Sequence, residues 1–167
     1  MGRSKKDDFR PVHTVQWAEM VSGPPPFARR RPRRVGARGQ GIRYEERAQA
    51  ECFVRFGEKY LAGPWFKFGC NDQIRHCQPD GLYIDPEQGL LVLNEIKYQH
   101  TYRAWQQLHQ LYIPVVQKVF ESAPWTIKCF EMVKWYDPAA FFPGPHILHP
   151  DPINGPSDKT MVLIWRP

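Results

Sequence analysis

Two apolar runs joined by a four-residue turn constrain the fold of this chain more than any other feature. Residues 79–85 and residues 90–97 flank a Pro-Glu-Gln-Gly sequence at residues 86–89. This pattern predicts two antiparallel strands connected as a β-hairpin. In such a hairpin Asp80, at the start of the first strand, returns beside Glu95, near the end of the second.

The charged residues of this hairpin fall on one face. Residues i and i+2 of a strand share a face, so Glu95 and Lys97 point together while Ile96 points into the core. The run 90–93 is apolar on both faces and therefore favours a buried strand. Two carboxylates close together in a buried sheet are costly unless a cation joins them. Carboxylate oxygens suit Mg²⁺ or Mn²⁺, and this pattern therefore predicts a divalent metal site.

Pro79-Asp80 followed by Glu95-Ile96-Lys97 resembles the signature of the PD-(D/E)xK nucleases. That superfamily includes restriction endonucleases, Holliday junction resolvases, and the RecB and lambda exonuclease types. The resemblance implies that Asp80, Glu95 and the backbone carbonyl of Ile96 bind the metal. It implies that Lys97 positions the nucleophile or neutralises the scissile phosphate. The alternative is a solvated hairpin with an ordinary surface Glu-Lys pair.

The same resemblance implies a third acidic ligand from the first helix. Many superfamily members carry a G-x-x-x-E arrangement there, and Gly41 to Glu45 fits that spacing. Glu45 is therefore the expected catalytic and metal-binding residue, with Glu46 as the alternative. The other interpretation is that Glu45, Glu46 and Glu51 form a solvated acidic face.

RecB-like members also carry Q-x-x-x-Y on the helix after the lysine. Here Gln107 and Tyr112 are five residues apart, which departs from the pattern by one. Gln107 is the expected catalytic residue that orients the nucleophile or the lysine, and Gln106 and Gln110 are alternatives.

The order of predicted elements defines the fold class. Strong helix formers predict a helix over 41–56, and a 3.6-residue apolar period predicts a second over 101–122, with Thr101 as N-cap and Pro114 as a kink. Strands are predicted at 65–68, 79–85, 90–97, 126–135 and 161–165, and the proline-rich residues 137–157 are expected to be irregular. The fold class is α+β (α/β), with a mixed central sheet flanked by helices. The order α-β-β-β-α-β plus a C-terminal strand matches the restriction-endonuclease-like core that the resemblance implies.

Positive charge is concentrated at the beginning of the chain. Residues 1–40 carry ten Lys and Arg against three acidic residues, whereas residues 41–167 carry 13 against 14. We therefore expect residues 1–40 to form a Pro/Arg-rich arm, largely extended or mobile, with a short helix at 12–20 that docks on a nuclease domain of residues 41–167. The arm would contact nucleic acid, and a solvated linker or a nuclear localisation tract is the alternative. The expected nucleic-acid-binding residues are Arg29, Arg30, Arg31, Arg33, Arg34 and Arg38 in the arm, and Tyr98, His100 and Arg103 after the lysine.

The remaining composition limits the class of protein. No run of 18 apolar residues and no signal-peptide pattern is present, so a soluble, cytoplasmic protein of a phage or bacterial host is expected. Its four cysteines are expected to be free and buried.

The predicted function is Mg²⁺- or Mn²⁺-dependent hydrolysis of phosphodiester bonds in DNA, structure-specific or nonspecific. DNA is the expected partner, and a homodimer is left open. The alternative is a non-catalytic nucleic-acid-binding or virion assembly protein that uses the basic arm.

Overall fold

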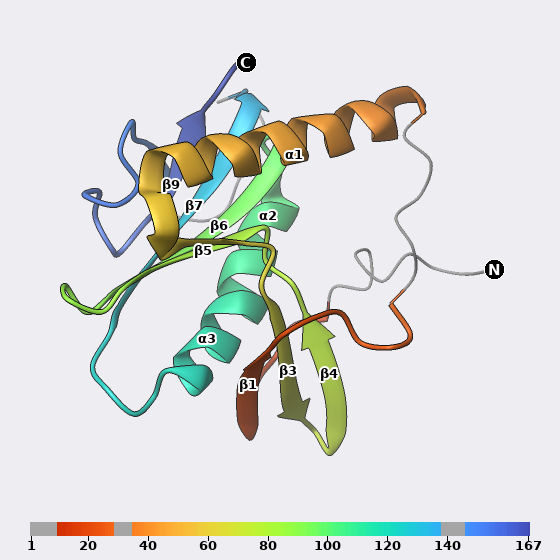
Figure 1. The fold of residues 1–167 in the computed structure, drawn as a ribbon, viewed down its shortest axis with the longest axis vertical. Coiled ribbons are helices and arrows are strands. Elements are labelled where there is room, and N and C mark those ends of the chain that lie inside the picture. The colour runs from red at the N-terminus through yellow and green to blue at the C-terminus, as the bar shows by residue number, and fades with distance from the viewer. Residues whose placement is uncertain (1–9, 29–34, 138–145) are drawn as a thin grey trace.

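A computed structural model describes residues 10–28, 35–137 and 146–167 (Figure 1). Its main feature is a six-stranded mixed sheet with the strand order β2-β5-β6-β7-β9-β8. These strands are β2 (Tyr60–Ala62), β5 (Gly81–Asp85), β6 (Leu90–Gln99), β7 (Thr126–Trp135), β9 (Thr160–Ile164) and β8 (His146–Leu148). A separate three-stranded sheet contains β1 (Trp17–Val21), β3 (Trp65–Cys70) and β4 (Gln73–Cys77). The protein is therefore α+β with a mixed central sheet, as predicted.

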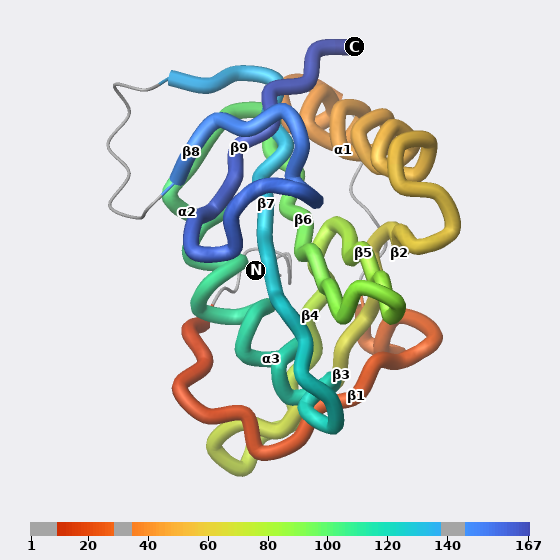
Figure 2. Tube along the Cα trace, turned by 90° about the vertical axis from the view of Figure 1, so that its left-hand side faces the viewer, coloured from red at the N-terminus to blue at the C-terminus, as the bar shows by residue number. Residues whose placement is uncertain are grey.

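Helices cover both faces of the large sheet (Figure 2). Helix α1 (Gly36–Phe56), followed by the short 3₁₀ turn η2 (Gly57–Lys59), lies on one face, where Tyr44, Ala48 and Cys52 pack against the sheet. A second helical segment covers the opposite face and consists of α2 (Tyr102–Gln107), the π-helical turn η3 (Leu108–Tyr112) and α3 (Ile113–Val119). Each face therefore has its own apolar core.

The predicted hairpin forms with the predicted register. Strands β5 and β6 are antiparallel, and Gly81 pairs with Asn94, so the next position outward places Asp80 beside Glu95. Gly89 closes the turn at φ +60°, a backbone conformation that glycine adopts without a steric penalty.

All strands of the large sheet except β5 run in the same direction. The helical segment α2-η3-α3 connects β6 to β7 as a crossover, and β7 is in turn parallel to β9. The carboxyl ends of β6, β7 and β9 therefore meet at one edge of the sheet (Figure 1). Open α/β sheets bind ligands at this kind of edge.

The second helical segment is interrupted at η3, which ends two residues before Pro114, the residue at which the sequence predicts a kink or an interruption. Pro114 lies in the first turn of α3 and has no N–H to donate to the carbonyl of Gln110. Val12 donates its backbone N–H to that carbonyl instead, at 2.8 Å. Because Pro114 does not bond to the Gln110 carbonyl, this carbonyl is available to Val12, and the hydrogen bond attaches the N-terminal segment to the helix.

The N-terminal segment differs from expectation in two ways. The helix predicted at 12–20 is wrong, because Trp17–Val21 form strand β1, which pairs with β3. The boundary at residue 40 falls inside α1, and Val12 is part of the core beneath α3. Residues 10–28 thus pack on the body, while Arg29, Arg30, Arg31, Arg33 and Arg34 lie outside the described residues.

Two further expectations can be compared with the structure. The strand predicted at 65–68 exists as part of β3, but it belongs to the small sheet, and β2 takes its place in the large one. All four cysteines are buried and free, as predicted. Among the described residues, the helices fall short of the length and hydropathy needed to cross a bilayer.

Candidate active site

Asp80 and Glu95 form the centre of the candidate site. Asp80 immediately precedes β5 and Glu95 lies on β6, both on the face covered by α2 and η3, and they are 2% and 0% exposed. Asp80 Oδ2 accepts the backbone N–H of Ile96 at 2.8 Å, which joins the two strands at this point. Asp80 and Glu95 are thus brought together on one face, as the sequence predicted.

Lys97 completes this group. Its Nζ donates to Glu95 Oε1, and its side chain retains 22% exposure. The strand ends two residues later, so Lys97 is the member of the group that reaches solvent. The Glu95 carboxylate is compensated by one ammonium on the same face of the same strand.

The π-helical turn brings Gln107 and Tyr112 together. Gln107 Nε2 donates to the Tyr112 hydroxyl at 3.3 Å although the residues are five apart. A π turn holds one residue more than an α turn, so the extra residue between Gln107 and Tyr112 is accommodated within η3. Gln107 and Tyr112 are therefore in contact although their spacing departs from Q-x-x-x-Y by one residue.

Tyr112 lies close to both carboxylates. Burial raises the pKa of Tyr112 well above its usual value, and the charges of Glu95 and Asp80 raise it further. Tyr112 also donates its hydroxyl hydrogen to the carbonyl of Gln78, two residues before Asp80, at 3.3 Å. The helical segment thus holds the chain that leads into Asp80.

The backbone of Asp80 is held from the other face as well. Its carbonyl accepts from Gly63 N at 2.9 Å and from Gln49 Nε2 at 2.8 Å. Gln49 lies on α1, so both helical layers contact the strand that carries the acid. This support limits the positions that the Asp80 backbone can adopt.

Glu45 is one helical turn before Gln49, on the helix that reaches the Asp80 carbonyl. Burial raises the pKa of Tyr60, and the charges of Asp80 and Glu45 both raise it further. The described residues contain no group of three His, Cys, Asp or Glu side chains placed to hold a metal ion. A third ligand from Glu45 or Glu46 stays a prediction.

Glu131 is a buried acid that was not among the residues predicted from the sequence. It pairs with Glu95 across the parallel strands β6 and β7 and is also 0% exposed. Its Oε2 lies 2.6 Å from His100 Nδ1, and its Oε1 accepts the backbone N–H of Thr101 at 3.3 Å. Glu131 therefore holds the turn between Lys97 and α2. The sequence feature that could have identified it is a charged residue inside an otherwise apolar strand, between Cys129 and Val133.

The expected nucleic-acid contacts are dispersed. His100 is buried rather than exposed, because its ring pairs with Glu131. Tyr98 is half-buried on the α1 face, where its ring meets Tyr44 edge-on at 5.8 Å. Arg38 and Arg103 are exposed, in the first turns of α1 and α2 respectively.

The donor set of the described residues suits a small, hard divalent cation. Mg²⁺ is commonly bound in proteins by one or two carboxylates, with water and substrate phosphate as its other ligands. Asp80 and Glu95 supply two carboxylates at one point on the sheet, and these oxygen ligands match that requirement without a third acid.

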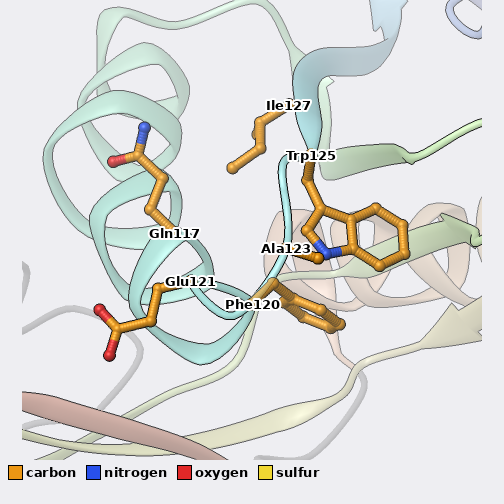
Figure 3. Close-up of a pocket in the computed structure, with 6 residues that line it drawn as sticks. All are labelled: Gln117, Phe120, Glu121, Ala123, Trp125 and Ile127. Carbon is orange, nitrogen blue, oxygen red and sulfur yellow. The ribbon is translucent and has the colours of Figure 1, made fainter.

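One surface hollow lies away from the candidate site. It has a volume of about 230 Å³ and lies where α3 meets the amino end of β7 (Figure 3). Phe120 and Trp125 pack edge-to-face on its wall, with ring centroids 5.5 Å apart. None of the candidate site residues lines it.

Comparisons of the chain with protein-family models, with curated proteins and with solved structures found no match.

Proposed function

We propose that this chain is a metal-dependent deoxyribonuclease of the PD-(D/E)xK type. One observation carries the proposal: the buried carboxylates of Asp80 and Glu95 lie at the same end of the β5–β6 hairpin, where Asp80 accepts the Ile96 N–H and Lys97 binds Glu95. Burying two like charges side by side is unfavourable in a protein that makes no use of them. The α+β fold with a helical crossover between β6 and β7 supports the same assignment.

Asp80, Glu95 and the carbonyl of Ile96 would hold Mg²⁺ or Mn²⁺. When bound, the ion lowers the pKa of a coordinated water and offsets charge on the phosphate. Lys97 lies where the buried pair meets solvent, so its ammonium would neutralise the scissile phosphate as it approaches.

Gln107 is suited to hold the nucleophile. Its side-chain oxygen is buried without a hydrogen-bond partner among the described residues, and its amide nitrogen is fixed by Tyr112. A water that donates to this oxygen would satisfy a buried acceptor that is otherwise costly. Gln107 would thereby orient the water that attacks the phosphorus.

The proposed substrate is DNA, cleaved in a structure-specific or nonspecific manner. The concentration of Lys and Arg in residues 1–40 supports a polyanionic partner. A homodimer stays a prediction that the molar mass in solution would test.

A cleavage assay with a matched control tests the proposal. Linear, nicked and branched DNA are incubated with Mg²⁺, with Mn²⁺ and with EDTA. We expect cleavage only with metal, and a rate at least about 100-fold lower for Asp80→Asn and for Lys97→Met, because each substitution removes one group that stabilises the transition state. Asp85→Asn is the control, because Asp85 is a buried acid on the same strand whose partners are ordinary donors.

Cleavage that persists in EDTA, or an Asp80→Asn variant as active as the wild type, would contradict the mechanism. DNA binding without cleavage under every metal condition would favour the non-catalytic alternative.

A further inference from the structure

Trp135 is a large aromatic side chain at the edge where the candidate site opens. It is the last residue of β7 and is 47% exposed. It pairs with Gln99 on β6, and Val133 pairs with Lys97. Trp135 therefore lies on the same face as Lys97, one row of side chains further toward the carboxyl edge, a step of about 6.6 Å for two strand residues.

Two cations accompany the indole ring. The Arg166 guanidinium lies 4.8 Å from the ring centroid, and Arg166 Nε donates to the carbonyl of Lys134 at 3.2 Å. Lys134 Nζ lies 5.9 Å from the Trp135 ring and 5.3 Å from the ring of Tyr98. The indole and the Arg166 guanidinium thus lie together near the end of β7, and the Lys134 ammonium approaches the ring from the α1 face, where it also meets Tyr98.

This combination suits one class of ligand. Proteins that bind single-stranded nucleic acid use positive side chains for the backbone and aromatic faces for the bases. Bases in a paired duplex are stacked on one another, so an indole at a protein surface can stack only on an unpaired base or a terminal pair. Because the two residues lie on neighbouring strands about 4.8 Å apart, their backbones are about 8 Å apart, which corresponds to two to three stacked nucleotides of about 3.4 Å each.

We propose that Trp135, with Lys134 and Arg166, binds an unpaired nucleotide next to the phosphate that Lys97 contacts. This proposal rests on the proposed nuclease function and specifies its substrate class: DNA with a single-stranded segment at the cleavage point, such as a frayed end, a gap or a flap. Lys134 and Arg166 would contact the phosphates that flank the stacked base.

The chain contains a matched control for this surface. Trp17 on β1 is 39% exposed and also has a lysine near its ring, with Lys67 Nζ at 5.7 Å. Its indole lies close to Gly69, where an added Cβ would stand 2.3 Å from the ring nitrogen. Trp17 thus packs within the small sheet, against the glycine that pairs with it. It lies on a different sheet from Lys97.

Binding without cleavage tests the proposal. Every protein carries Asp80→Asn, the buffer contains EDTA, and fluorescence anisotropy follows labelled oligo(dT) and a blunt duplex with capped ends. We expect Trp135→Ala to weaken oligo(dT) binding about tenfold or more, the usual loss for one stacked base. Trp135→Phe should retain part of the affinity, Trp17→Ala should retain all of it, and Trp135→Ala should leave duplex affinity unchanged. Circular dichroism confirms that each variant is folded.

Three results would overturn the proposal: no oligo(dT) binding by the parent protein, equal binding by Trp135→Ala, or the same loss in Trp17→Ala. Arg166→Gln provides a second measurement at an exposed side chain, and it should lower the salt dependence of oligo(dT) binding. Because no metal and no cleavage are involved, a failure of this surface is distinct from a failure of the nuclease proposal.

Discussion

The two ends of strand β5 each bury an aspartate, and they do so in opposite ways. Asp85, at the turn end, accepts from the Tyr83 hydroxyl at 3.1 Å and from Gln88 N at 3.3 Å, and it pairs with Lys59 at 2.9 Å. Asp80, immediately before the open end, accepts the backbone N–H of Ile96 at 2.8 Å and also lies near a second buried carboxylate, that of Glu95. A buried acid surrounded by donors stabilises a fold, whereas a buried acid beside another acid requires a further reason. Burial alone therefore does not identify a functional acid.

The largest contrast should come from removing the lysine at each end. Lys97→Met leaves the Glu95 carboxylate buried without its ammonium, and we expect a loss of about 2–3 kcal/mol in unfolding free energy, below the range for a fully buried pair because Lys97 is partly solvated. Lys59→Met should cost much less, because Lys59 is 41% exposed and Asp85 keeps its other donors. Urea unfolding of both variants measures the difference. Equal losses would remove the distinction between the two ends.

Neutralising an acid at each end should give changes of opposite sign. Glu95→Gln retains the side-chain shape and removes a charge from beside Asp80 and Glu131, so its unfolding free energy should equal the wild-type value or exceed it by up to about 1 kcal/mol. Asp85→Asn should instead lower it, because three donors lose an anionic acceptor. Thermal and urea unfolding at pH 7 report both signs. A destabilised Glu95→Gln would mean that the open end contributes to stability like the turn end.

The smallest effect concerns acid stability. The Lys59 ammonium, with smaller contributions from Tyr83 and Gln88, holds the pKa of Asp85 below its usual value. A lowered pKa contributes stability that is complete above the ordinary aspartate pKa of about 3.9 and is lost as the pH falls from there toward the folded value. Between about pH 5 and about pH 3, the free energy of unfolding should therefore fall more for the wild type than for Asp85→Asn. If the urea midpoints of the wild type and of Asp85→Asn fall by the same amount across this range, Asp85 contributes nothing to acid stability.

Local patterns made the β5–β6 hairpin predictable. The turn at 86–89 and the apolar run at 90–93 set its register, and that register placed Asp80 beside Glu95. Glu131 was not predictable in the same way, because its position beside Glu95 depends on a parallel register set by the length and packing of the intervening helices. The Gln107–Tyr112 contact required the π turn, which no propensity rule indicates.

Pairings between distant segments also escaped prediction. Strand β1 forms against β3, more than 40 residues further on, and its own sequence carries no turn or partner that would indicate a strand. The same applies to β2, which is three residues long and replaces the predicted strand at 65–68 in the large sheet.

The hydrogen bond from Val12 to the carbonyl of Gln110 has a consequence for the order of assembly. A ribosome makes Val12 about a hundred residues before the helix that offers this acceptor, and β1 must wait for β3 in the same way. The first described residues to be synthesised are therefore among the last to be fixed. Until Pro114 has been added and the helix around it has formed, the N-terminal segment remains outside the native contacts, so folding of the whole chain cannot finish from its beginning.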